Sequence, residues 1–90
     1  MPERATVRIV NREGLHARPI SRFVQLAARY EATLQVTGPD GTVADGSSVF
    51  SMMTLAAGAG ADLVLQADGP QARELLAALV QLVGEGFGET

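Results

Sequence analysis

Residues 5–29 read ATVRIVNREGLHARPISRFVQLAAR, and the spacing of the apolar side chains changes partway along them. Ala5, Val7 and Ile9 alternate with polar neighbours, which is the period-two pattern of a half-buried strand. From residue 17 onward the apolar positions follow helical spacing, in a stripe of Ile20, Phe23, Val24, Ala27 and Ala28. A strand is therefore expected to pass through a short loop into a helix of residues 17–29.

The helix is expected to begin close to His16. Proline lacks an N–H and is tolerated only in the first helical turn, so Pro19 places the helix start just before it. His16 then stands where backbone N–H groups lack helical partners and the helix dipole favours an anion. Arg18 adds a cation with several donors, and Gly14 allows the loop to bend tightly. This run predicts an anion site beside an imidazole.

Each of these residues also has an ordinary alternative. A histidine at a helix start is most often a surface residue without chemistry, and a lone arginine in a first turn is most often solvated. The clustering of the residues favours a function over these alternatives. A neutral imidazole keeps one ring nitrogen with a free lone pair, so it can be a nucleophile. We therefore predict that a phosphate is held on or beside His16, with Arg18 steadying it.

The remaining pattern predicts an α+β fold in a single domain, residues 1–90. Strands are expected at 33–37 and 42–44, joined by a turn at 38–41, and again at 61–67. The last helix should carry an apolar stripe and end at three glycines, the stripe being Ala72, Leu75, Leu76, Leu79, Val80 and Val83. Helices then cover one face of a sheet whose other face meets solvent. Strand order does not follow from these patterns.

Residues 47–53, SSVFSMM, have two interpretations. In one, Ser47 or Ser48 caps a short helix reaching about residue 55, and at least half of its large apolar side chains pack into the core. In the other, the exposed ones among Val49, Phe50 and Met53 form an adaptable docking patch. Phosphorylation of Ser48 would add about −1.5 to −2 charge units there, which an anionic partner would repel.

Composition excludes several classes of site. The chain has no cysteine and one histidine, so disulfides, thiolate chemistry and metal binding are not expected. Seven arginines, no lysine and ten acidic residues give a net charge of −3 without a basic run, so nucleic acid is not an expected partner. These arginines are scattered singly, and we assign a function only to Arg18. No apolar run approaches the about 18 residues that span a bilayer, so a cytoplasmic location is expected.

The run Gly14-Leu15-His16-Ala17-Arg18-Pro19, followed by a helix with Phe23-Val24, resembles the active-site signature of the HPr family, the histidine phosphocarriers of the bacterial phosphotransferase system. The resemblance covers nearly the whole chain. It implies an open-faced βαββαβα sandwich, with a four-stranded antiparallel sheet covered on one face by three helices. It also implies that enzyme I, charged by phosphoenolpyruvate, phosphorylates Nδ1 of His16, and that an enzyme IIA receives the group. Such a carrier is a monomeric substrate of other phosphotransferases, without hydrolysis or a cofactor.

The same resemblance implies roles for further residues. Arg18 matches the arginine that steadies the phosphate, and Ser48 matches a serine that a dedicated kinase, with a phosphorylase, modifies in some members. The partner-docking positions are Ala17, Ser21, Val49, Phe50 and Met53.

Two departures from the family pattern bear on these roles. Asp45-Gly46-Ser47 precedes Ser48, whereas several kinase-regulated members carry a basic residue just before the serine, and this departure argues against kinase control of Ser48. The tail from Gly69 resembles the nitrogen-related NPr branch more than the sugar carriers. The alternative function is a regulatory binding module that phosphorylation of His16 or Ser48 controls without onward transfer.

Overall fold

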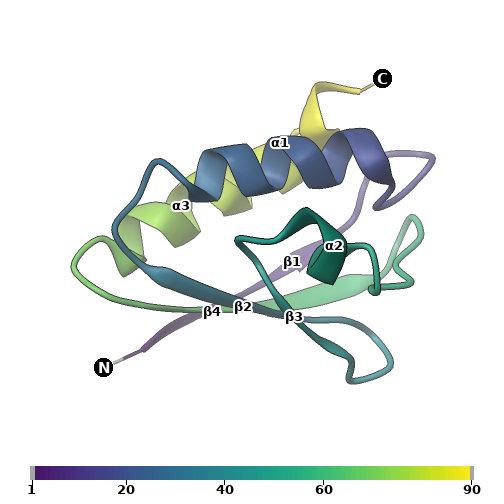
Figure 1. Ribbon diagram of the computed structural model, residues 1–90. Coiled ribbons are helices and arrows are strands. Elements are labelled where there is room, and N and C mark those ends of the chain that lie inside the picture. The colour runs from purple at the N-terminus through teal and green to yellow at the C-terminus, as the bar shows by residue number, and fades with distance from the viewer. Residues whose placement is uncertain (1, 90) are drawn as a thin grey trace.

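A computed structural model describes residues 2–89 of the 90-residue chain as one sheet with helices on one of its faces (Figure 1). The elements follow in the order β1 (Glu3–Arg8), α1 (Ala17–Ala27), β2 (Thr33–Thr37), β3 (Val43–Asp45), α2 (Val49–Met52), β4 (Asp62–Asp68), α3 (Ala72–Gly84) and a 3-10 turn, η1 (Gly86–Gly88). The predicted α+β class and βαββαβα order are confirmed. Within residues 2–89 no helix is long and apolar enough to cross a membrane.

The four strands are antiparallel and lie in the order β1-β4-β2-β3. Side chains facing the helices meet across the strands, with Val7 opposite Leu63 and Val36 opposite both Leu65 and Ala44. All five are buried, so the sheet contributes a continuous apolar layer. The side chains predicted to face outward are exposed or half-buried, namely Thr6, Arg8, Gln35, Thr37 and Gln66.

Helices α1 and α3 pack against each other over this apolar layer (Figure 1). Ile20 and Phe23 of α1 are buried, as is most of the α3 stripe. Two predicted positions are wrong. Helix α1 ends at Ala27, so Ala28 caps the helix and is exposed. Val80 is 43% exposed, because a six-residue stripe is wider than the surface that α3 rests on.

The C-terminal glycines do more than end a helix. Between Gly86 and Gly88, Phe87 turns back into the core, where it is 0% exposed. Its backbone has φ 58, a left-handed conformation that costs an L-residue about 1–2 kcal/mol. Burial of a Phe side chain returns about 1.5–3 kcal/mol, so the turn is favourable. The Arg22 guanidinium also donates to the Phe87 carbonyl, which fastens the tail to α1.

Candidate functional site

His16 is the N-cap of α1, where the sequence placed it. Its backbone is extended, and its carbonyl accepts the first intrahelical bond from the Ile20 N–H at 3.0 Å. The preceding loop is held against the rest of the molecule, because the Leu15 N–H donates to the Ala57 carbonyl at 2.9 Å. Leu15 itself is buried, whereas 37% of the His16 side chain is exposed. The imidazole is therefore anchored through its backbone and open to a partner.

One ring nitrogen of His16 already has a partner. Nε2 lies 3.3 Å from Oε2 of Glu89 and 3.4 Å from Oε1, while the nearest Glu13 oxygen is 3.9 Å away. An ionised carboxylate only accepts hydrogen bonds, so the ring nitrogen facing it carries the proton in a neutral imidazole. The lone pair is then on Nδ1. In this arrangement Nδ1 is the ring nitrogen whose lone pair is available to attack.

Glu89 is held as a carboxylate. Its side chain is 21% exposed, and its Oε1 accepts a hydrogen bond from Asn11 Nδ2 at 3.1 Å. Burial alone would raise the pKa of Glu89. Hydrogen bonds from Asn11 and His16, with the positive charge of Arg18, outweigh burial and hold that pKa below its ordinary value of 4.5.

A hollow of about 660 Å3 opens beside the ring, lined by Arg12, Glu13, His16, Ala17, Arg18, Arg22, Gly88 and Glu89. Two further arginines, Arg12 and Arg22, line the same hollow, and the expectation that only Arg18 bears on function stays a prediction. Arg22 follows Arg18 by one helical turn, a spacing that could have signalled it. Glu89 had no such signal, since it lies 73 positions from His16 in the sequence. A helix start with arginines in the lining of the hollow suits a small anion, although the Arg22 guanidinium is already bonded to the Phe87 carbonyl.

The other predicted residues lie outside this hollow. Ser21 is half-buried on α1, and its hydroxyl accepts from Gln25. Ser48 is the N-cap of α2, and its Oγ accepts from the Ser51 N–H at 3.1 Å, so the predicted cap is confirmed. Helix α2 packs against α1, which places Ser48 on an element neighbouring the one that begins at His16.

The expectation that at least half of the large apolar residues of segment 47–53 enter the core was wrong. Only Met52 is buried, whereas Val49 is 40%, Met53 53% and Phe50 89% exposed. A helix of four residues has too few turns to bury more than one side. Val49, Phe50 and Met53 therefore form an exposed apolar group on α2, which we call the α2 patch.

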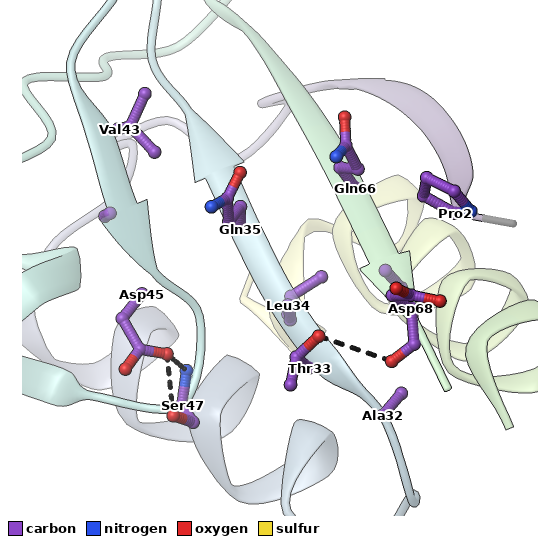
Figure 2. A pocket seen from close by; sticks show the side chains of 12 residues that line it. Pro2, Ala32, Thr33, Leu34, Gln35, Val43, Asp45, Ser47, Gln66 and Asp68 are labelled. Carbon is purple, nitrogen blue, oxygen red and sulfur yellow. Dashed lines mark hydrogen bonds between the residues drawn. The ribbon is translucent and has the colours of Figure 1, made fainter. Parts of the chain in front are cut away.

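A second hollow, of about 610 Å3, lies over β2, β3 and β4 (Figure 2). Its labelled side chains include Gln35 and Gln66, with Asp45 bonded to Ser47 at one edge. Among its 12 lining residues, all within the described part of the chain, there is no basic side chain and no histidine. It offers carboxylates, amides and two hydroxyls, but neither the imidazole nor the guanidiniums that line the His16 hollow.

Comparison with known proteins agrees with this geometry. A family model described as the PTS HPr component phosphorylation site matches residues 3–85. The phosphocarrier protein NPr of Klebsiella oxytoca is 37% identical over 99% of both chains, and the phosphocarrier protein HPr of Pseudomonas aeruginosa is 41% identical over 92% of both. Since both names occur at similar identity, the expected NPr branch stays a prediction.

Solved structures give the same result for the fold. The crystal structure of HPr-C-His from Thermoanaerobacter tengcongensis superposes with a TM-score of 0.91 at 34% identity, covering 98% of each chain. That of a phosphocarrier protein HPr from Bacillus anthracis gives 0.85 at 33% identity, covering 91% of this chain and 96% of the other. From the fold, the family match and the full-length relatives, the chain belongs to the HPr family of phosphocarrier proteins of the phosphotransferase system.

Proposed function

We propose that this chain takes a phosphoryl group from enzyme I onto Nδ1 of His16 and passes it to an enzyme IIA. The observation that carries the proposal is the half-exposed imidazole at the start of α1, whose Nε2 is paired with Glu89 and whose other nitrogen has no hydrogen-bond partner among residues 2–89. The Nδ1 lone pair attacks phosphorus, a P–N bond forms, and the bond from phosphorus to the donor breaks with its electron pair leaving on the donor. The second transfer reverses these roles.

The start of α1 can hold the added phosphate. The amides of Ala17 and Arg18 precede the first intrahelical bond, which Ile20 donates, so they have no helical partner. Arg18 is exposed on the same turn and can offer two donors to phosphate oxygens. A site that binds the phosphate from one side only leaves the phosphorus atom accessible to the next nucleophile. The geometry therefore suits a carrier better than a hydrolase.

Docking of both partners is assigned to Ala17, Ser21 and the α2 patch. Phe50 is exposed at 89% and belongs to a helix that packs beside α1, so a protein contacting it also covers the neighbourhood of His16. Small apolar contacts of this kind suit brief encounters. We place this exchange in the cytoplasm, where phosphoenolpyruvate is made.

Labelling tests the proposal. The protein is incubated with enzyme I, magnesium and phosphoenolpyruvate labelled in its phosphate, and we expect an acid-labile label on the wild type and none on His16→Ala. Addition of an enzyme IIA should remove the label. Label that never leaves would support the regulatory module instead, and a wild type that takes no label would refute phosphoryl acceptance.

The same assay measures the contribution of Arg18. We expect Arg18→Ala to accept the phosphoryl group more slowly, because one of the groups that bind it is lost. Arg73→Ala is the matched control, since Arg73 is an exposed arginine of α3 outside the His16 hollow. Equal rates for the two variants would refute the role of Arg18.

Ser48 is our candidate for regulatory phosphorylation. Its hydroxyl caps α2, directly before Val49 of the α2 patch, so a phosphate there would place negative charge at the docking surface. We expect Ser48→Asp to lower the rate of transfer from enzyme I, whereas Ser47→Asp, one residue further from the patch, should lower it less. Similar rates for the two variants would remove Ser48 from the proposal.

A further inference from the structure

We infer that Glu89 is a positioning residue for His16, and that Asn11 together with the anchored tail holds Glu89 in place. The inference rests on the proposed phosphoryl acceptance at Nδ1. The sequence near His16 does not indicate the contact with Glu89, because Glu89 lies 73 positions away in the chain.

The first step is the effect of a carboxylate on a free ring. A side chain that is 37% exposed can rotate and can carry its proton on either nitrogen. Both oxygens of Glu89 lie within 3.4 Å of Nε2, so the N–H is favoured on Nε2 and that edge of the ring is turned towards the tail. Nδ1 then faces away from the tail with its lone pair free. A nucleophile whose orientation is already fixed in this way loses less conformational freedom when it attacks.

The second step is the way Asn11 is used. Asn11 is the one buried polar residue among residues 2–89, at 4% exposed. Both of its amide hydrogens are engaged, one with the Gly14 carbonyl at 2.7 Å and one with Oε1 of Glu89 at 3.1 Å. Asn11 therefore ties the loop that leads into His16 to the carboxylate that faces the ring.

The Asn11 side chain donates to these two acceptors, but its own Oδ1 is buried without a hydrogen-bond partner among residues 2–89. A buried polar atom left unpaired is unfavourable and calls for an explanation. Turning the amide over would set Oδ1 against two oxygens and lose both donated bonds. The orientation with two donors is retained because it serves Gly14 and Glu89 together.

The third step is the tail that delivers Glu89. Phe87 is fully buried two residues before it, and the Arg22 guanidinium binds the Phe87 carbonyl. The Glu89 N–H also donates to the Gly86 carbonyl at 2.9 Å. With these contacts the last turn is fixed on the body of the molecule. Glu89 is thus presented by a structured segment and not by a loose end.

The test removes the charge of Glu89 while keeping its shape. In Glu89→Gln the new amide can donate to Nε2 as well as accept from it, so the preference for the Nε2–H form should weaken. Glu85→Gln is the matched control, because Glu85 is an exposed carboxylate of the same tail that bonds to Gln81 away from the ring. Asn11→Asp is the second variant, since it loses both donors and places a like charge beside Glu89.

Two readouts are needed. Nitrogen-15 NMR of the His16 ring reports which nitrogen carries the proton, and single-turnover labelling by enzyme I reports the rate of acceptance. We expect both Glu89→Gln and Asn11→Asp to shift the ring towards the Nδ1–H form and to slow acceptance about two- to tenfold, the range for the loss of one hydrogen bond. Glu85→Gln should match the wild type in both readouts.

The outcomes separate the two proposals. Ring spectra and rates in Glu89→Gln that match Glu85→Gln would overturn the positioning role, and so would a slower rate with an unchanged ring. A wild type that takes no label would refute the proposed function, while the ring spectra would still test whether Glu89 orients the imidazole. If Asn11→Asp fails to fold, Glu89→Gln decides the matter alone.

Discussion

Replacement of Gly14 by alanine probes the loop that presents His16. Gly14 has φ +73, and a Cβ there would lie 2.8 Å from the Ala57 carbonyl oxygen and 2.8 Å from the Gly58 Cα. The left-handed backbone costs an alanine about 1–2 kcal/mol. Both close neighbours are backbone atoms, so two segments must separate, for which overpacking suggests a further about 1–3 kcal/mol. We expect Gly14→Ala to lower the free energy of unfolding by about 2–5 kcal/mol.

Gly41→Ala separates the two contributions. Gly41 also has a positive φ, +88, but nothing lies within 4 Å of its Cβ position, so only the backbone cost of about 1–2 kcal/mol applies. Equilibrium urea unfolding followed by far-ultraviolet circular dichroism measures both variants, since the chain has no tryptophan to report by fluorescence. Equal losses of stability in the two variants would refute the steric argument. A slower phosphoryl acceptance is expected only in Gly14→Ala, because its loop leads directly into His16.

Three further outcomes are expected. Leu79→Ala should lower the free energy of unfolding by about 2–5 kcal/mol, and Val80→Ala by at most about 0.5 kcal/mol, because Leu79 is 0% exposed and Val80 is 43% exposed. Similar urea midpoints for the two variants would contradict the assignment of Leu79 to the core. Phe50→Ala should leave the thermal melt unchanged but weaken binding of enzyme I in a titration, and an unaltered affinity would remove Phe50 from the docking surface. Hydrogen bonds from the Ser47 hydroxyl and backbone N–H lower the pKa of Asp45 below its ordinary 3.8. The ionised Asp45 therefore stabilises the fold above pH 3.8, and this contribution is lost as the pH falls through the lower pKa of the folded state. Melting temperatures of Asp45→Asn should therefore fall less steeply than those of the wild type below about pH 4, and superimposable pH curves would count against this.

Local patterns predicted the parts of the fold that depend on neighbouring residues. Pro19 and the change from period two to helical spacing placed the start of α1 beside His16, which the structure confirms. The turn at residues 38–41 likewise joins the paired strands β2 and β3. In each case the deciding residues lie within one element or one turn. These are the distances over which backbone preferences act.

Long-range features could not be predicted in this way. The position of β4 depends on pairing with β1 across 54 residues or more and with β2 across up to 35 residues, which no single-strand pattern encodes. The burial of Phe87 was not predicted, because the three glycines around it indicate only the end of a helix and not a residue that folds back into the core. Glu89 was missed with it. Two of the eight residues that line the His16 hollow, Gly88 and Glu89, therefore come from a segment that meets the histidine only after the chain has folded.

The anchored tail also decides where a fusion partner or an affinity tag can be attached. The start of β1 and the yellow C-terminal segment lie at opposite sides of the molecule in Figure 1, and Glu89 of that segment contacts His16 at the start of α1. A peptide appended at this end leaves from the rim of the hollow where we propose that enzyme I docks, and it can crowd the imidazole or displace the Glu89 carboxylate. Tags, dyes and surface linkers for kinetic work therefore belong before β1, on the side of the molecule away from the C-terminal segment.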